Sequence, residues 1–254
     1  MLDSHLIPSV DWGIRPILFS MNGFNIPSYS FFVALGVIIG FGYYVYQAKK
    51  DRRLGENSFV IVIAALLGGA IGAKVFKFVI DYQFVISHFS DSYLLLSGRT
   101  IVGGFIGGYV AVAIVKRVLK IRERKGNYFA PGIALGVAVG RIGCFLAGCC
   151  YGKATGLPIG IDFGDGVLRH PTQLYESVFM IVMFFYLSKI RKKESLEPGY
   201  LFKVLMVGYF IFRFFVEFLK EETVILMGLN IFQLISVCAI IYLLRDDIFK
   251  RYRK

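Results

Sequence analysis

The sequence contains little cysteine, and its few cysteines do not follow a familiar metal-binding pattern. Four cysteines occur in 254 residues. Two of them are adjacent, which is not a standard zinc-ligand spacing, and no histidine stands at ligand distance from them in the sequence. We therefore expect no metal site. The four cysteines are Cys144, Cys149, Cys150 and Cys238.

Acidic residues are also scarce, because 17 Asp and Glu stand against 29 Lys and Arg and the formal net charge is +12. Such a basic chain could bind nucleic acid, but it lacks a stripe of Lys and Arg interleaved with aromatic residues along a soluble element. Its charges cluster between apolar runs, as in membrane proteins whose basic loops stay in the cytoplasm. We therefore exclude nucleic acid as a partner.

The first 25 residues lack a continuous apolar stretch, because Pro8, Asp11 and Pro16 interrupt them. A secretory signal peptide needs an uninterrupted apolar segment. We therefore expect no cleavable signal peptide.

Apolar residues are present in excess: 56% of the chain is hydrophobic and the mean hydropathy is +0.64. A soluble domain would be about 45–50% apolar. The excess lies in runs of about 17–23 residues, the length that crosses a hydrocarbon core of about 30 Å. We predict an all-α polytopic membrane bundle of about seven transmembrane helices, one transmembrane domain over 1–254, with no disulfide framework. The runs are 28–48, 58–80, 100–115, 128–147, 173–187, 200–219 and 227–244.

The basic residues predict how the runs are oriented. The segments after the first, third, fifth and seventh runs carry nineteen Lys and Arg, whereas the opposite side carries five. Basic loops stay in the cytoplasm. We therefore predict a multi-pass protein of a bacterial inner (plasma) membrane, with the N-terminus outside and the C-terminus in the cytoplasm. The loop segments 81–97 and 148–172 then lie on the outer side.

Two arginines, Arg141 and Arg213, fall in the predicted outer halves of the fourth and sixth runs. An ionised group at membrane depth costs several kcal/mol unless it is paired or reaches water. Glu217 follows Arg213 by four residues and shares its helix face. The pair is therefore either an ordinary intrahelical salt bridge or part of a charged cavity suited to an anionic lipid headgroup.

Glycines are concentrated in the second, third and fourth runs. Small residues three or four positions apart let helix backbones approach closely in lipid. Alternatively, 103–108 is a broken segment whose free backbone amides bind a phosphate. Glycines alone do not decide between these interpretations.

Three strings of residues stand in an informative order: GRIGCF at 140–145, RHPTQLYE at 169–176 and RFFVEFLK at 213–220. Together with their spacing and predicted topology, they resemble the prolipoprotein diacylglyceryl transferase family. The resemblance extends over about 27–244, and the His-Pro-Thr-Gln-Leu-Tyr-Glu string is its most specific part. Weaker matches are Pro27, Tyr29, 67–69, 103–108 and 233–236.

The resemblance implies a reaction. The family transfers the diacylglyceryl group of phosphatidylglycerol to the lipobox cysteine thiol of a preprolipoprotein and releases glycerol phosphate.

The resemblance also implies that Arg141 and Arg213 hold the phosphate and that Glu217 orients Arg213. Its partners would be phosphatidylglycerol, the lipobox segment and membrane lipids, and no metal or organic cofactor is expected. The expected substrate-binding residues are Tyr29, Arg99, Gly103, Gly104, Gln173, Tyr175, Glu176 and Tyr209. Arg99 either adds charge to the cavity or is a solvated loop residue.

The chain departs from the family pattern at three positions. Val102, Cys144 and Cys149 stand where the family usually has His, Asn and Glu. His170 is then the remaining candidate for a general base, or else it is a structural residue whose ring bonds a loop carbonyl. Cys144, Cys149 and Cys150 are either small apolar residues or thiols with a covalent or redox role.

These departures keep two alternatives open. One is a divergent lipid-headgroup transferase with another acceptor, possibly dependent on its cysteines. The other is a non-catalytic lipid-binding membrane protein of the same fold. A transporter would more often show internal repeats, and we find none.

Overall fold

The computed structural model describes residues 14–21, 24–52, 55, 57–80, 86, 100–121, 126–192 and 196–252. The chain divides into two compact units. The first comprises Met1–Lys50 and Arg124–Lys254, and the second comprises Asp51–Glu123. A single transmembrane domain over 1–254 stays a prediction.

The described residues are mainly helical. The first unit holds α1 (Ser28–Lys50), α6 (Gly126–Leu146), α7 (Thr172–Arg191), α8 (Tyr200–Val216) and α9 (Ile231–Tyr252), and the second holds α2 (Asn57–Ile80) and α5 (Ile101–Val118). Five of these helices, α1, α2, α5, α6 and α7, are long and apolar enough to cross a membrane. The predicted fold class, a polytopic membrane protein built from helices, is confirmed. The number of crossings and the sides of the termini stay predictions.

The sixth and seventh predicted runs differ from the helices that form. Helix α8 ends at Val216, and Glu217–Leu219 form the 3-10 helix η2. Helix α9 begins at Ile231 rather than at 227, because the preceding residues form a hairpin of β5 (Val224–Leu226) and β6 (Leu229–Asn230). Met227 and Gly228 both have positive φ at its turn, as tight hairpins require. Because the hairpin and the helix that follows it are both apolar, the sequence shows them as one continuous apolar run.

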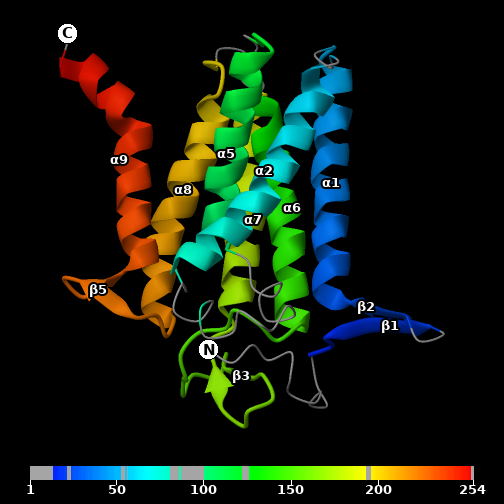
Figure 1. The fold of residues 1–254 in the computed structure, drawn as a ribbon, viewed down its shortest axis with the longest axis vertical. Coiled ribbons are helices and arrows are strands. Elements are labelled where there is room, and N and C mark those ends of the chain that lie inside the picture. Colours follow the sequence, from blue (N-terminus) through cyan, green and yellow to red (C-terminus); the bar gives the residue numbers. More distant parts are fainter. Residues whose placement is uncertain are drawn as a thin grey trace. The chain divides into compact units, whose positions relative to one another are not determined.

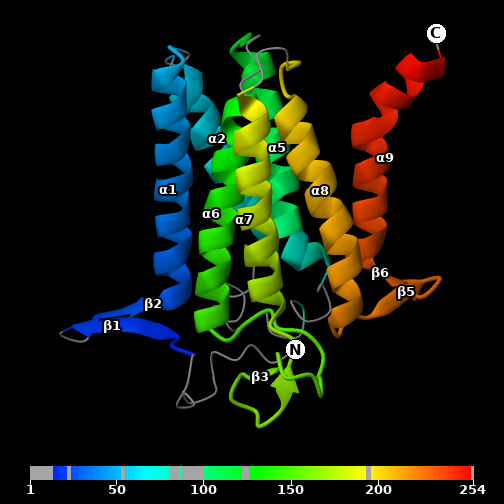
Figure 2. The ribbon, with the colours of Figure 1, turned by 180° about the vertical axis from the view of Figure 1, so that it is seen from behind.

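Three hairpins lie at one end of the first unit, as Figures 1 and 2 show. They are β5–β6, β1 (Ile17–Met21) with β2 (Phe24–Pro27), and β3 (Ile161–Asp162) with β4 (Leu168–Arg169). The same end gathers the first turns of α1, α7 and α9 and the last turns of α6 and α8. We call it the hairpin end. The basic last turns of α1 and α7 lie at the opposite end.

Helices α1 and α6 pack backbone to backbone. A Cβ placed on Gly36 would lie 2.4 Å from the carbonyl oxygen of Gly136, and one on Gly40 would lie 2.5 Å from that of Gly132. No side chain fits at such distances, so glycine permits the close approach. This contact holds α6, and with it Arg141, against α1.

In the second unit, α2 and α5 meet through glycines in the same way. A Cβ on Gly72 would lie 2.5 Å from the carbonyl oxygen of Gly103. Helix α5 is continuous from Ile101, and the Gly103 amide donates to the Thr100 hydroxyl at 3.2 Å. The hypothesis of a broken phosphate-binding segment at 103–108 is therefore wrong, and the packing interpretation holds.

Candidate active site

Helices α6, α7 and α8 bring three buried charges together near the hairpin end. Arg141 Nη2 lies 2.5 Å from Glu176 Oε2, and Arg213 Nη1 lies 3.7 Å from the same oxygen. Their relative exposures are 4%, 1% and 6% for Arg141, Glu176 and Arg213. Two arginines that are 72 positions apart in the sequence thus share one carboxylate.

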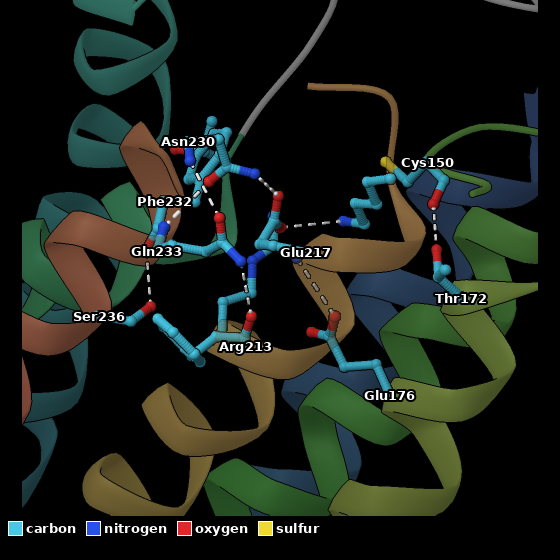
Figure 3. Close-up of polar contacts among 12 residues, drawn as sticks. Cys150, Thr172, Glu176, Arg213, Glu217, Asn230, Phe232, Gln233 and Ser236 are labelled. Atoms are coloured by element: carbon cyan, nitrogen blue, oxygen red, sulfur yellow. Dashed lines mark hydrogen bonds and ion pairs between the residues drawn. The ribbon is translucent and has the colours of Figure 1, made fainter. Parts of the chain in front are cut away.

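A second carboxylate, Glu217, lies beside the first group. Its Oε1 is 2.5 Å from Arg213 Nη2 and 3.6 Å from Lys220 Nζ. The pairing of Arg213 with Glu217, expected from their spacing, is therefore present. Lys220 follows η2 and is buried; burial lowers its pKa, and the Glu217 carboxylate opposes that shift. Figure 3 shows these contacts at the end of α8.

The start of α9 holds Glu217 in place. Asn230 Nδ2 donates to Glu217 Oε2 at 3.0 Å. Asn230 and Gln233 cap α9 reciprocally, because each backbone N–H donates to the side-chain oxygen of the other, at 2.9 and 3.0 Å. Gln233 Nε2 also donates to the Phe214 carbonyl at 3.2 Å, which ties α9 to α8 (Figure 3).

The charges of this group do not cancel. Arg141, Arg213 and Lys220 face two carboxylates, which leaves one positive charge among these described ion pairs. In addition, Arg141 Nε and the Nε and Nη1 of Arg213 are buried and find no hydrogen-bond acceptor among the residues that the structure describes. Buried N–H groups almost always have a partner. Excess charge and unused donors together suit an anionic ligand.

The 169–176 string connects α7 to the loop that follows α6. Thr172 Oγ1 donates to the Cys150 carbonyl at 2.7 Å, and Gln173 Nε2 donates to the Cys149 carbonyl at 2.5 Å. Gln173, expected to bind substrate, therefore supports the loop backbone. Its contact with substrate stays a prediction.

Within the described part of the chain, the His170 ring bonds the Tyr175 side chain and not the loop carbonyl that the structural alternative expects. Its Nδ1 lies 3.2 Å from the Tyr175 hydroxyl, and the two rings meet edge to face. Among the described contacts, neither side chain joins the ion pairs. The roles of His170 as a base and of Tyr175 in binding stay predictions.

Cys144, Cys149 and Cys150 come together although the sequence separates the first by five residues. Their sulfur atoms all lie within 4.8 Å of one another. Cys144 Sγ also lies 3.9 Å from Arg141 Nη1. Cys238 is exposed on α9 and does not belong to this group. We refer to the three as the thiol cluster.

The remaining expected site residues lie in different places. Tyr209 is fully buried and its hydroxyl donates to Glu176 Oε1 at 3.3 Å. Tyr29 lies in the first turn of α1, where its Cα approaches Gly143 of α6. Gly103 and Gly104 belong to the second unit, and Arg99 lies outside the described residues.

Comparison with known proteins identifies the family. The family description that matches residues 16–245 is "prolipoprotein diacylglyceryl transferase". The chain belongs to this family. Similar family members come from Clostridium tetani, with 33% identity over 82% of this chain and 86% of the relative, and from Finegoldia magna, with 32% over 89% and 91%. Clostridioides difficile has one with 32% identity over 89% and 91%. All three are called phosphatidylglycerol–prolipoprotein diacylglyceryl transferase.

No site role is expected from the sequence for three residues that the structure places beside the ion pairs: Lys220, Asn230 and Gln233. Lys220 stands three residues after Glu217, which is a helical neighbour spacing. Asn230 and Gln233 have the spacing of a capping box. Both signals are present in the sequence, but each is short and common.

Proposed function

We propose that this chain transfers the diacylglyceryl group of phosphatidylglycerol to the lipobox cysteine of prolipoproteins, in the inner (plasma) membrane of a bacterium. Membership of the family supports the reaction class. The observation that carries the proposal is the pair of buried arginines on Glu176, with unused N–H donors and one excess positive charge. Phosphatidylglycerol carries one phosphodiester charge, which matches that excess.

The reaction requires deprotonation of the acceptor thiol and stabilisation of the leaving phosphate. The acceptor thiol loses its proton, and its sulfur attacks the glyceryl methylene carbon that bears the phosphate. A C–S bond forms, the C–O bond breaks, and glycerol phosphate leaves with the electron pair. Because negative charge grows on the leaving phosphate, fixed donors aimed at it lower the barrier.

In this proposal Arg141 and Arg213 bind the phosphate directly. Glu176 and Glu217 position the two guanidinium groups, and Tyr209 holds Glu176. Lys220 adds positive charge, and Asn230 fixes Glu217. The hairpin end faces the outer side of the membrane, where prolipoprotein acceptors are exposed.

The test is a transfer assay with the purified full-length chain. The chain is placed in vesicles of phosphatidylglycerol with a lipobox peptide, and the thioether adduct is measured by mass spectrometry. We expect adduct with this donor, none in vesicles of phosphatidylcholine alone, and none with a peptide whose cysteine is replaced by serine. Absence of adduct with the cysteine peptide in phosphatidylglycerol vesicles would contradict the proposal.

A second candidate keeps the lipid donor and changes the acceptor. The observation that favours it is the thiol cluster, which occupies two positions that are polar in the family's usual pattern. The same assay separates the two candidates. Release of glycerol phosphate without a peptide adduct would favour the other acceptor, whereas release that matches adduct formation would exclude it.

A further inference from the structure

The loop after α6 folds back onto its helix in a way that gathers sulfur atoms. Gly148 has a φ of +66° and its N–H donates to the Phe145 carbonyl, while the Cys149 N–H donates to the Cys144 carbonyl at 3.1 Å. This is a Schellman motif, in which a left-handed residue reverses the chain over the last helical turn. The motif places Cys149 against Cys144.

The third thiol is held at the same place by an unusual backbone. Cys150 has a φ of +65°, a conformation that costs a non-glycine residue free energy and that persists where surrounding contacts impose it. The imposing contact is the hydrogen bond from Thr172 Oγ1 to the Cys150 carbonyl, drawn in Figure 3. Gln173 holds the neighbouring carbonyl of Cys149. Two residues at the start of α7 thus fix the backbone that carries two of the thiols.

We propose that the thiol cluster binds one zinc ion through Cys144, Cys149 and Cys150. A zinc–sulfur bond is about 2.3 Å, so three sulfurs around one tetrahedral zinc lie about 3.8 Å apart. The observed separations, all within 4.8 Å, need only a small contraction. Three thiolates and Zn²⁺ carry one net negative charge, and the Arg141 guanidinium lies 3.9 Å from Cys144 Sγ.

The site leaves a fourth position for a further ligand. Among the residues that the structure describes, no other histidine, cysteine or carboxylate joins the cluster. Zinc with three protein ligands is typical of catalytic sites, in which the fourth position takes water or substrate. Cys150 is the exposed member of the cluster and Cys144 is its buried member, so in this proposal a ligand reaches the fourth position from the side of Cys150.

The chemistry of that ligand follows from the proposed function, on which this step rests. The lipobox cysteine binds zinc as a thiolate and releases its proton to solvent. Its sulfur then attacks the glyceryl carbon, the carbon–oxygen bond breaks, and glycerol phosphate leaves with the electron pair; zinc keeps its oxidation state. Arg141 lies next to the cluster and binds the leaving phosphate, so nucleophile and leaving group meet at one site. Zinc thereby replaces the polar groups that the family pattern usually supplies.

Metal binding is tested without reference to activity. The purified full-length chain is kept reduced, loaded with Zn²⁺ or Co²⁺ and desalted, and bound metal is measured by elemental analysis. We expect about one ion per chain and, for Co²⁺, the near-ultraviolet absorption of thiolate-to-cobalt charge transfer. Cys150→Ser, chosen because Cys150 is exposed, is expected to lose both signals, whereas Cys238→Ser keeps them. Equal thermal unfolding of both variants shows that folding is intact.

Each of the following results either supports or overturns the zinc site. Absence of bound metal, retention of metal by Cys150→Ser, or a disulfide among the three cysteines in the protein purified without oxidant would overturn it. A lipobox peptide is expected to change the Co²⁺ spectrum, and its serine analogue is not; equal spectra would overturn the open fourth position. Full transfer after zinc removal would overturn the role of the metal and leave the proposed function standing. Bound zinc without any transfer would support the metal site and refute the proposed function.

Discussion

Replacing Glu176 with glutamine tests whether one carboxylate holds two buried arginines together. The substitution keeps the shape of the side chain and removes its charge, which leaves three cations against Glu217 alone. At an effective dielectric constant of about 20, opposite charges about 4 Å apart attract by about 4 kcal/mol. Loss of one partner of a buried ion pair costs about 3–5 kcal/mol of folding free energy.

We therefore expect Glu176→Gln to lower the unfolding midpoint in detergent by about 10 °C, taking roughly 2–4 °C per kcal/mol for a chain of this size. Glu221→Gln is the matched control, because Glu221 pairs with Arg169 at 3.7 Å on the surface and is 56% exposed. Its midpoint should change by no more than about 4 °C, since an exposed pair contributes less than about 1 kcal/mol.

The assay also includes lipid. Added phosphatidylglycerol should raise the midpoint of Glu176→Gln more than that of the unaltered chain, because the variant buries more uncompensated positive charge. A midpoint equal to that of the unaltered chain, within about 2 °C, would refute the reasoning that Glu176 joins the two arginines.

Three further predictions concern packing, capping and the surface. Gly40→Ala should lower the unfolding free energy by about 1–3 kcal/mol, because its Cβ would meet a backbone oxygen of α6, whereas Gly42→Ala, with open space around it, should cost nothing in the same denaturation assay. Asn230→Ala should cost about 1–3 kcal/mol in thermal unfolding, since it removes the cap of α9 and the donor to Glu217; an unchanged midpoint would argue against this link. Arg169→Ala should change stability by less than about 1 kcal/mol and keep the transfer rate, and a large loss of rate would place Arg169 in the site.

The helices were predictable because each contains an apolar run, and basic residues end several of these runs. Lys49 and Lys50 end α1, and Lys189 and Arg191 end α7, as the charge pattern indicated. The β5–β6 hairpin was not predictable from hydropathy, since its residues are as apolar as the helix that follows. Two positive-φ residues at its turn and the cap at Asn230 separate it from α9.

The candidate site was predictable where residues lie on one helix and was not where they lie on several. The pairing of Arg213 with Glu217 follows from a spacing of four residues. The contact of Arg141 and Arg213 with Glu176 joins three helices, and no local pattern encodes it. Their predicted convergence came from resemblance to the family.

The proximity of the three thiols was also not predictable from a local pattern in the sequence. From the sequence no metal site is expected, because two adjacent cysteines do not have a standard zinc-ligand spacing. A helix-ending turn at Gly148 brings the three sulfur atoms together instead. The glycine is visible in the sequence, but the direction of the returning chain depends on contacts with α7.

The central claim is that Arg141 and Arg213 bind the phosphate of phosphatidylglycerol at one place. The most direct test compares kcat/KM for transfer in the unaltered chain, Arg141→Gln and Arg213→Gln, with Lys203→Gln as the control that removes a positive charge from the opposite end of α8. Loss of one donor to a developing charge costs about 10²–10³ in rate, so both arginine variants should fall by at least about 100-fold while the control stays within about twofold. An arginine variant that transfers as fast as the control would contradict the account.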